Sequence, residues 1–154
     1  MTPRISIITI TFNSESTLEE TIRSVVSQDY QEMEYLIIDG GSIDRTLDIV
    51  EQYKEKIDVI ISEPDKGISD AFNKGISRAT GEIVGIINSD DILLPGALTK
   101  IAQAYNPETD VYSGLMYCWN DKTDEKFLFY PDLTFDKLKL QYSVTHQSRF
   151  IRRD

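Results

Sequence analysis

Cysteine is nearly absent from this chain of 154 residues, which carries only Cys118. A disulfide within the chain and a cysteine-rich zinc site are therefore both excluded. Basic residues are also scarce, because 16 Lys and Arg face 26 Asp and Glu, a formal net charge of −10. That balance argues against a non-specific grip on nucleic acid or anionic lipid, which needs clustered Lys and Arg. It leaves room for a phosphate-bearing ligand, since a divalent metal can join acidic protein to acidic ligand.

Long hydrophobic runs are missing too. No apolar run approaches the roughly 18 residues that a membrane span needs. The opening MTPRISIITITF has one Arg and no small-residue cleavage site, so it is typical of a first strand and not of a signal peptide. We therefore expect a cytoplasmic protein. The sequence also lacks GxGxxG after the first strand and GxxxxGK[ST], so a ligand pyrophosphate would need other partners.

What the chain does contain is a regular alternation of apolar strands and amphipathic helices, at a length that suits one domain. Four strands are predicted, at Ile5–Thr11, Tyr35–Ile38, Val59–Ile61 and Ile83–Ile87. A helical pattern follows each of them, with Ser14 or Ser16 as the expected cap of the first helix and Asp44 of the second. This order predicts an α/β fold with a mostly parallel, Rossmann-like sheet and helices on both faces.

The pattern changes after Asn106. Val111–Trp119 and Phe127–Tyr130 are predicted to be strands that pair like a hairpin around a polar turn at Asn120–Glu125. Phe135–Leu140 has a weak helical pattern.

Polar residues gather where the predicted strands end. In open sheets of this kind, ligands bind beyond the carboxyl ends of the strands. The sequence therefore predicts a site built from four segments: Thr11–Asn13, Asp39–Ser42, Glu63–Gly67 and Asn88–Asp91.

Two of these segments carry carboxylates that suit ligand binding. Asp90 and Asp91 repel each other at the end of a buried strand, and a hard divalent cation relieves that repulsion. The alternative is that the pair only caps the next helix. Asp39 can accept hydrogens from a nucleobase or a ribose, or it can belong to an ordinary turn in which Asp44 is the cap.

Other polar residues have two readings each. Lys66, beside Gly67, can place an ammonium near phosphates or can be a solvated turn residue. Asp70 and Asn73 can face a ligand or form polar surface. His146, the sole histidine, can be a general base or a metal ligand, but a single histidine without evident partners is more often structural. Three residues near the end are phosphate contacts or, as we favour, a solvated face: Arg149, Arg152 and Arg153.

Taken in order, six segments resemble the family 2 glycosyltransferases of GT-A fold, which are nucleotide-diphospho-sugar transferases. The segments are Ser6–Asn13, Ser24–Gln28, Ile37–Asp44, Glu63–Gly75, Thr80–Glu82 and Asn88–Asp91. The resemblance covers about residues 4–105, and Thr145–Arg152 adds a weaker similarity. It implies one GT-A domain over residues 1–154, with a nucleotide-binding part at about 4–105 and the start of an acceptor-side part at 106–154.

The resemblance also implies roles for individual residues. Thr11 and Asn13 would lie against the nucleoside, and Asp39 would read the base. The stretch Lys66–Asn73 would border the nucleotide through Lys66, Gly67, Asp70 and Asn73. Asn88, Ser89 and Asp90 occupy the family's DxD position, so Asp90 would be the main ligand of Mn²⁺ or Mg²⁺ and Asp91 a supporting one.

The implied activity is inverting transfer of a sugar from a nucleotide-diphosphate sugar to an acceptor hydroxyl, in the synthesis of a cell-surface polysaccharide or glycan. The implied partners are the donor, a sugar or glycan acceptor, and a membrane reached peripherally through the acceptor. A homodimer is expected on other grounds, because Val111–Trp119 or Phe127–Tyr130 could pair with a second copy. Nucleic acid is not expected as a partner, because of the acidic charge balance. Three features depart from the family, and the first, Ile10 where many members have Pro, affects the geometry of the strand end little. Asn88 replaces the first Asp of DxD, and the family's general base, a later carboxylate, would fall beyond Asp154 in a chain that we expect to be shortened.

Two other classes of function remain as alternatives. A chain without its base would in practice be a non-catalytic nucleotide-binding fragment or module. A phosphoacceptor receiver domain is also doubly wound, but receivers gather acids at the first strand end, and here Thr11–Asn13 holds none before Glu15.

Overall fold

The computed structural model describes residues 2–120, 122–129 and 146–153. The helix predicted at 135–140 lies outside these residues. Within them, no helix is long and apolar enough to cross a membrane.

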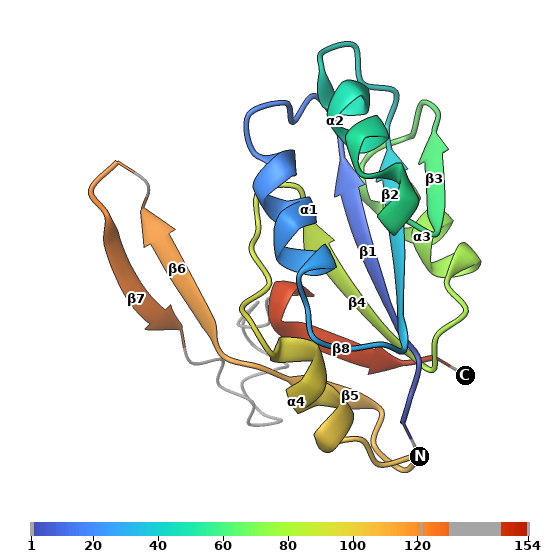
Figure 1. Cartoon of the computed structure of the whole chain (residues 1–154), viewed down its shortest axis with the longest axis vertical. Helices are drawn as coiled ribbons and strands as arrows, with labels where there is room; N and C mark the ends of the chain where they lie inside the picture. The colour runs from blue at the N-terminus through green and yellow to red at the C-terminus, as the bar shows by residue number, and fades with distance from the viewer. Residues whose placement is uncertain (1, 121, 130–145, 154) are drawn as a thin grey trace.

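A six-stranded mixed sheet forms the body of the molecule, with the strand order β3-β2-β1-β4-β8-β5 (Figure 1). The strands are β1 (Ile5–Thr11), β2 (Met33–Asp39), β3 (Val59–Ser62), β4 (Ile83–Asn88), β5 (Val111–Ser113) and β8 (Arg149–Arg152). The first four strands are parallel, and β8 runs antiparallel to both β4 and β5. The predicted α/β fold with a mostly parallel sheet is confirmed.

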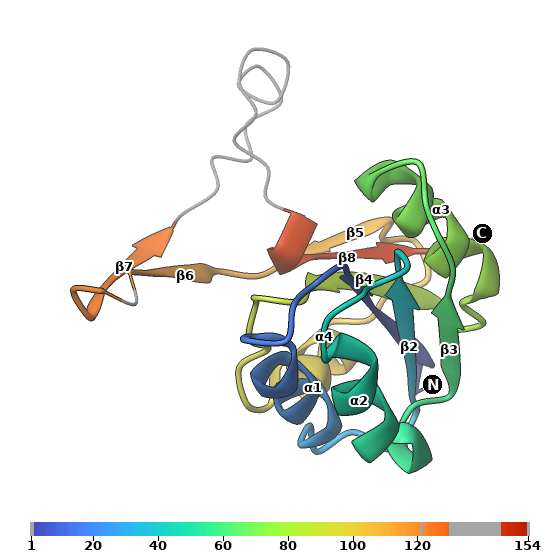
Figure 2. The same ribbon diagram turned by 90° about the horizontal axis from the view of Figure 1, so that it is seen from above.

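Helices cover both faces of this sheet, as predicted. They are α1 (Leu18–Val26), α2 (Thr46–Gln52), α3 (Ile68–Arg78) and α4 (Ala97–Gln103), with short 3-10 turns at η1 (Lys54–Lys56) and η2 (His146–Ser148). Figure 2 shows α1, α2 and α4 on one side of the sheet and α3 on the other. The chain thus reverses direction across the sheet when it passes from β3 through α3 to β4, which leaves β1 and β4 side by side at the topological switch point.

Each face of the sheet has its own hydrophobic core. On the side of α1, α2 and α4, Ile7 and Ile37 pack with Leu18 and Leu98. On the side of α3, Ile8 and other sheet residues pack against Ala71. Every residue of β1 is buried, which explains why its sequence is a continuous β-branched run and not an alternating one.

Glycine permits the close approach of α3 to the sheet. A Cβ added at Gly75 would lie 2.5 Å from Cγ2 of Ile8, closer than real Cβ atoms come to a neighbour. The helix can therefore press its backbone against β1 only because position 75 has no side chain.

The region after α4 departs from the sequence prediction. The single strand expected over Val111–Trp119 is two strands, β5 in the main sheet and β6 (Met116–Asn120), with a break at Gly114 and Leu115. Only β6 pairs with β7 (Glu125–Phe129), so the predicted hairpin exists but is shorter. The prediction merged the two strands because both halves of the segment are apolar. In the structure β5 pairs with β8, a strand much later in the chain, and so belongs to the main sheet.

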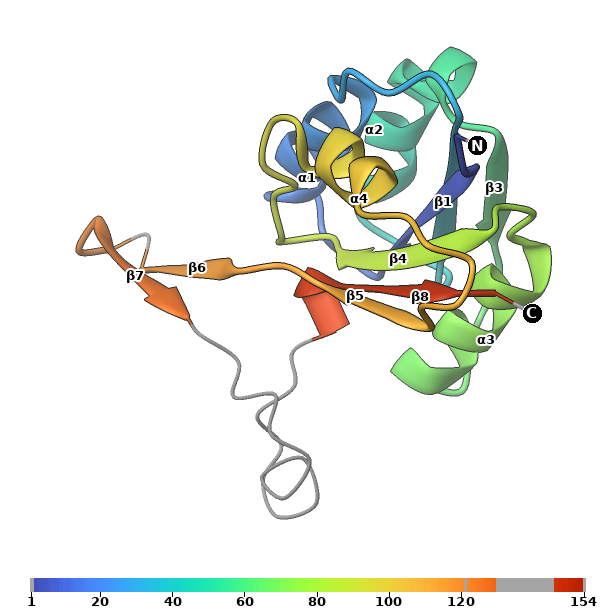
Figure 3. The same cartoon turned by 90° about the horizontal axis from the view of Figure 1, so that it is seen from below.

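The β6–β7 hairpin projects from the body of the molecule, as all three overall views show (Figures 1, 2 and 3). Apolar side chains on it are exposed: Leu115 at its base, Tyr117, Trp119 and Phe127.

Candidate nucleotide-sugar site

The carboxyl ends of β1, β2, β3 and β4 lie at one edge of the sheet, and the segments predicted to form the site meet there. Thr11 pairs with Asp39 across β1 and β2, and Asp39 pairs with Ser62 across β2 and β3. On the other side of β1, Ile10 pairs with Asn88. The parallel register therefore brings four polar segments together from across the first 91 residues.

A hydrogen bond spans the switch point between β1 and β4. Ser14 Oγ lies 2.8 Å from Ser89 Oγ, so the loop after β1 contacts the loop after β4. The expected side-chain cap of α1 by Ser14 or Ser16 is wrong. Ser14 instead accepts the N–H groups of Thr17 and Leu18 at its carbonyl, which leaves its hydroxyl available for Ser89.

Asp39 lies at the centre of the edge and is fully buried. Its Oδ2 accepts the hydroxyl of Ser62 at 2.7 Å and the N–H of Gly41 at 3.1 Å, and both of its oxygens bond to Ser42. Gly41 has a φ of 87°, in the left-handed region that glycine adopts most readily, so the turn closes tightly over the carboxylate. Asp39 thus holds the loop after β2 in shape, and its reading of a nucleobase stays a prediction.

Asn13 joins the loops that follow β1 and β2. Its N–H donates to Ser42 Oγ at 2.8 Å, and its side-chain oxygen accepts the N–H of Ile43 at 2.9 Å. Asp44 Oδ1 accepts the N–H of Thr46 at 3.0 Å, but the N-cap position of α2 is Arg45 and has no side-chain cap, so the prediction that Asp44 is the cap is wrong. Thr11 is buried, and its hydroxyl has no hydrogen-bond partner among the described residues.

The loop after β3 packs against the same turn. A Cβ at Gly40 would lie 2.5 Å from a carboxylate oxygen of Asp65, so Gly40 permits this contact. Lys66 is exposed, and its N–H donates to Asp70 Oδ2 at 3.1 Å. The ammonium that pairs with acids here belongs to Lys74, 3.1 Å from Glu63 and 3.6 Å from Asp70.

The remaining two residues predicted on this segment differ in what surrounds them. Asn73 is exposed on α3. Gly67, with a φ of 108°, begins α3 in a conformation that favours glycine. Their contact with a ligand stays a prediction.

The segment Asn88–Asp91 carries the two carboxylates at the end of β4. Asp90 is exposed, whereas Asp91 is half-buried and accepts the N–H of Asn88 at 3.3 Å. Burial, and then the charge of Asp90, raise the pKa of Asp91 more than hydrogen bonds from Asn88 and Gln147 and the charge of His146 lower it. This like-charge pair is thus unfavourable as it stands, and a cation beside it would relieve the repulsion.

A buried glutamine fixes the loop that follows these carboxylates. Gln28 Nε2 donates to the carbonyls of Leu93 at 3.2 Å and Leu94 at 3.1 Å, and its Oε1 accepts the N–H of Leu98. Ser24 Oγ accepts the N–H of Leu93 at 3.0 Å. These contacts give a physical reason for the Ser24–Gln28 segment, which anchors the loop after β4 to the end of α1.

His146 lies in the site, although the sequence favoured a structural role for it. Its Nε2 is 3.1 Å from Asn88 Oδ1, and its ring packs edge-on against Phe72 of α3, with ring centroids 5.4 Å apart. Gln147, which the sequence did not single out, hydrogen-bonds Asp91. His146 and Asn88 are 58 positions apart, so no local pattern in the sequence indicates their contact. The one signal that could have placed His146 and Gln147 in the site was the similarity of Thr145–Arg152 to the glycosyltransferase family.

Of the three arginines near the end, Arg153 is exposed, as we favoured, whereas Arg149 and Arg152 are half-buried. Arg149 is half-buried, and its Nε and Nη2 atoms are buried without a partner among the described residues. Arg152 pairs with Asp110 at 2.7 Å, and Arg153 donates to the carbonyls of Gly81 and Thr80.

The donor set at the end of β4 fits a hard divalent cation that is completed by its ligand. Within residues 2–120, 122–129 and 146–153, no group of three or more His, Cys, Asp and Glu is arranged to hold a metal. Asp90 and Asp91 supply two carboxylates, and Mg²⁺ is commonly held by one or two carboxylates together with substrate phosphates. The oxygens of a diphosphate and of water would provide the rest.

This arrangement defines the class of protein: a doubly wound α/β domain with an acidic ligand site at its switch point. Comparison with known proteins gives the family. The sequence profile of glycosyl transferase family 2 matches residues 6–152, and the chain belongs to this family.

Relatives and solved structures agree. The chain is similar to TuaG of Bacillus subtilis, a glycosyltransferase provisionally assigned to teichuronic acid biosynthesis. The two sequences are 33% identical over 141 aligned residues, and the alignment covers 87% of this chain and 56% of TuaG. Residues 1–349 of Staphylococcus aureus TarS, solved with UDP-GlcNAc, align with a TM-score of 0.61 and 32% identity over 70% of this chain and 33% of that one. The mannosyltransferase PcManGT of Pyrobaculum calidifontis, solved with GDP-Man and Mn²⁺, aligns with a TM-score of 0.66 and 25% identity over 73% and 35%.

These neighbours have the GT-A fold, which confirms the expected family and fold. The chain spans about half the length of the curated relatives that it matches.

Proposed function

We propose that this chain forms the donor-binding part of an inverting glycosyltransferase. The enzyme would move a sugar from a nucleotide-diphosphate sugar to an acceptor hydroxyl in the synthesis of a cell-surface glycan. The observation that carries the proposal is the position of Asp90 and Asp91 at the carboxyl end of β4, joined to the loop after β1 through Ser89 and Ser14. A diphosphate bound at this switch point would lie beside both carboxylates.

The nucleoside would be held by the loops after β1 and β2. Asp39 fixes the turn at Gly41 and Ser42, and Asn13 ties that turn to β1. Because these hydrogen bonds within the protein hold the turn in one shape, little ordering remains to oppose binding. Thr11 and Asp39 are the proposed contacts to nucleoside and base, and the segment Lys66–Asn73 is the proposed border of the nucleotide.

Asp90, supported by Asp91, is the proposed ligand of Mn²⁺ or Mg²⁺. When bound there, the cation would neutralise charge that develops on the diphosphate leaving group. PcManGT is similar to this chain and was solved with Mn²⁺, which supports the proposal. Asn88 brings no charge, and its side-chain oxygen is already bonded to His146, so we assign it to positioning the loop.

The remaining partners complete the proposal. TarS was solved with UDP-GlcNAc and PcManGT with GDP-Man, which supports a nucleotide-sugar donor of either base. The provisional role of TuaG in teichuronic acid biosynthesis supports a glycan acceptor. A cytoplasmic location, peripheral contact with a membrane through the acceptor, and a homodimer are also part of the proposal.

Calorimetry tests this function directly. The chain is titrated with UDP, GDP, CDP and ADP, each with Mn²⁺, with Mg²⁺ and with EDTA. We expect one nucleoside diphosphate to bind best and only weak binding in EDTA. Equal affinity for all four, or affinity that EDTA leaves unchanged, would contradict the proposal.

A second candidate is a nucleotide-binding module that transfers nothing. This candidate is favoured because the side chains that could act as a general base already form hydrogen bonds within the protein. Both oxygens of Asp39 accept hydrogen bonds, and Nε2 of His146 lies within hydrogen-bond distance of Asn88, whereas a base must reach the acceptor hydroxyl at about 2.6–3.2 Å.

An assay of nucleoside diphosphate release separates the two candidates. With a donor that is shown to bind and a panel of sugar acceptors, the module predicts no acceptor-dependent release. Acceptor-dependent release that is lost in His146→Ala would exclude the module and make His146 the base.

A further inference from the structure

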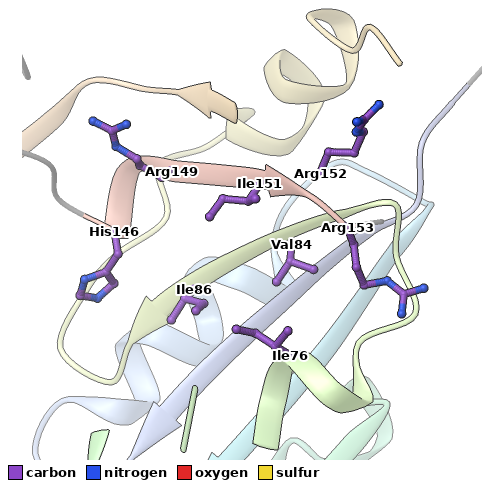
Figure 4. Close-up of a pocket in the computed structure, with 8 residues that line it drawn as sticks. All are labelled: Ile76, Val84, Ile86, His146, Arg149, Ile151, Arg152 and Arg153. Carbon is purple, nitrogen blue, oxygen red and sulfur yellow. The ribbon is translucent and has the colours of Figure 1, made fainter. Parts of the chain in front are cut away.

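Apolar contacts along one side of α3 fix this helix to the sheet. Ala71 is buried in the core on that face, and Gly75 packs its backbone against Ile8 of β1. Ile76 lies with Ile86 of β4 along an apolar pocket of about 390 Å³, as Figure 4 shows. These contacts hold the helix independently of the loop that precedes it, so a side chain of α3 can serve that loop as a fixed point.

Lys74 reaches from α3 to this loop. Its Nζ donates to the carbonyl of Pro64 at 3.0 Å. The same ammonium lies 3.1 Å from a carboxylate oxygen of Glu63 and 3.6 Å from one of Asp70. The Lys74 side chain is only 19% exposed, so these contacts are largely shielded from solvent. Because hydrogen bonds from a charged donor are stronger than neutral ones, Lys74 ties residues 63 and 64 firmly to the helix.

The loop that Lys74 holds packs against the turn around Asp39. A Cβ added at Gly41 would lie 3.3 Å from the backbone nitrogen of Pro64. The N–H of Gly41 donates to Oδ2 of Asp39, and the N–H of Glu63 donates to the carbonyl of Asp39 at 3.0 Å. The backbone at residue 64 therefore adjoins the glycine that closes the turn over the proposed base contact.

Negative charge gathers on this loop, and Lys74 offsets it. Glu63 and Asp65 lie on the loop, and Asp70 lies in the first turn of α3, where it accepts the N–H of Lys66 at 3.1 Å. Burial lowers the pKa of Lys74, but hydrogen bonding and the charges of these three carboxylates, led by Glu63, raise it by more. Lys74 thus stays charged at neutral pH, and it relieves the repulsion that the carboxylates exert on one another and on an incoming diphosphate.

We propose that Lys74 is a positioning residue of the nucleotide site, which holds the loop at residues 63–67 against Gly40 and Gly41. The turn around Asp39 then keeps one shape, and less ordering opposes the binding of a nucleotide. Because its ammonium already contacts Pro64 and Glu63, Lys74 acts through the loop and not on a phosphate of the ligand. Its effect on nucleotide binding rests on the proposed function, whereas its hold on the loop does not.

Solvent exchange of backbone amides, measured by NMR without nucleotide, tests the hold on the loop. The informative N–H groups are those of Gly41, Lys66 and Gly67, which donate to carboxylates within the turn, the loop and the start of α3. Lys74→Met removes the charge and keeps the length of the side chain. Lys54→Met is the matched control, because Lys54 is also paired with an acid but lies in η1, at the other end of β3.

We expect Lys74→Met to speed the exchange of these amides at least fivefold and Lys54→Met to leave it unchanged. Lys74→Arg should restore slow exchange, because a guanidinium can donate to the same carbonyl and carboxylate. Circular dichroism shows whether each variant is folded. Glu63→Gln changes a side chain that is 58% exposed, and its expected twofold faster exchange suffices if Lys74→Met is unfolded.

NMR titration in Mg²⁺ tests the effect on the site. The ligands are the nucleoside, the monophosphate and the diphosphate of whichever base binds best among U, G, C and A. We expect Lys74→Met to weaken all three by the same factor, at least fivefold, because a loosened turn already affects the nucleoside. A loss that grows with each phosphate would make Lys74 a direct phosphate contact and would overturn the positioning role.

Other results would overturn the proposal as well. They are unchanged exchange in Lys74→Met, exchange in Lys74→Arg as fast as in Lys74→Met, and faster exchange with unchanged affinity for nucleotide. The two readouts also separate this proposal from the proposed function. Faster exchange in Lys74→Met, in a chain whose wild type binds no nucleotide, would support the hold on the loop while contradicting the proposed function.

Discussion

Asp39 builds the turn after β2, and it is also the proposed contact to the nucleobase. It is fully buried, and its oxygens accept hydrogen bonds from Ser42, Ser62 and the N–H of Gly41. If it also reads the base, it must exchange one of these bonds for a bond to the ligand. Its two roles therefore differ in what a substitution should change.

We expect Asp39→Asn to lower the affinity for the preferred nucleotide far more than the affinity for its rivals. A hydrogen bond to a charged group contributes about 1.5–3 kcal/mol, which is about a tenfold to hundredfold change in affinity. Calorimetry with the four nucleoside diphosphates measures it. Ser62→Ala is the control, because it removes a partner of Asp39 and leaves the charge. An equal loss for every base would assign Asp39 to the turn alone.

His146 shows what residue-level reasoning from the sequence could not find. A lone histidine has no spacing pattern, so nothing near it in the sequence indicated Asn88 as its partner. Asp90 and Asp91 could be proposed from the sequence because adjacent carboxylates at the end of an apolar run are a local pattern. The same limit explains why the buried, unpartnered state of Arg149 was missed.

At the scale of elements, a second polar cluster fastens the opposite end of the sheet. Glu34 of β2 is buried and accepts the N–H of Thr80 at 2.8 Å, the hydroxyl of Thr80 at 2.6 Å and the hydroxyl of Ser6. Arg4 lies 3.6 Å from the carboxylate. These contacts join β1 and β2 to the turn that leads into β4, and so they help set the register on which the site depends.

The pKa of Glu34 gives this cluster a pH dependence. Burial raises the pKa of Glu34, but the hydrogen bonds from Ser6 and Thr80 and the charge of Arg4 together lower it by more than burial raises it. The net shift of the pKa is therefore downward. The folded protein then binds this proton less tightly than the unfolded chain. The stabilisation is complete above the ordinary pKa of about 4.3 and is lost as the pH falls through the lowered value.

We expect Glu34→Gln to reduce the free energy of unfolding at pH 7 by about 1.5–3 kcal/mol, because donors to a buried carboxylate lose their partner. The difference from wild type should shrink as the pH falls below about 4. Urea unfolding between pH 3 and pH 7 measures both effects. Glu55→Gln, at an exposed position in η1, is the control and should change little. A difference that stayed constant with pH would show that the charge of Glu34 contributes nothing.

The elements that the sequence predicted well are those whose pattern is local. β1 is a continuous run of buried β-branched residues, and its predicted bounds match the structure. β8 was not predicted as a strand, because its four residues, Arg149–Arg152, are half charged and it forms only by pairing with β4 and β5. The split of Val111–Trp119 depends on the same pairing.

At the scale of the whole molecule, the β6–β7 hairpin is the surface that we expect to bind another protein chain. A two-stranded hairpin is marginally stable by itself in water. Tyr117 is 56% exposed, Phe127 is 61% exposed and Leu115 is 58% exposed. Both edges of the hairpin can also pair with another strand.

We expect the chain to form a homodimer through this hairpin and expect Tyr117→Glu together with Phe127→Glu to make it monomeric. Light scattering coupled to size exclusion, at several protein concentrations, measures the mass. Lys122→Glu in the turn is the control. A wild type that is monomeric at every concentration, or a dimer that survives the double substitution, would contradict the proposed homodimer.

The account as a whole depends on a diphosphate that reaches Asp90 through a divalent cation. The most direct measurement is the affinity of the preferred nucleoside diphosphate with and without Mn²⁺, in wild type, Asp90→Asn and Asp91→Asn. The predicted result is that Mn²⁺ strengthens binding in wild type, that Asp90→Asn abolishes this gain, and that Asp91→Asn reduces it less. A gain from Mn²⁺ that persists in Asp90→Asn, or a wild type that binds equally well in EDTA, would contradict it.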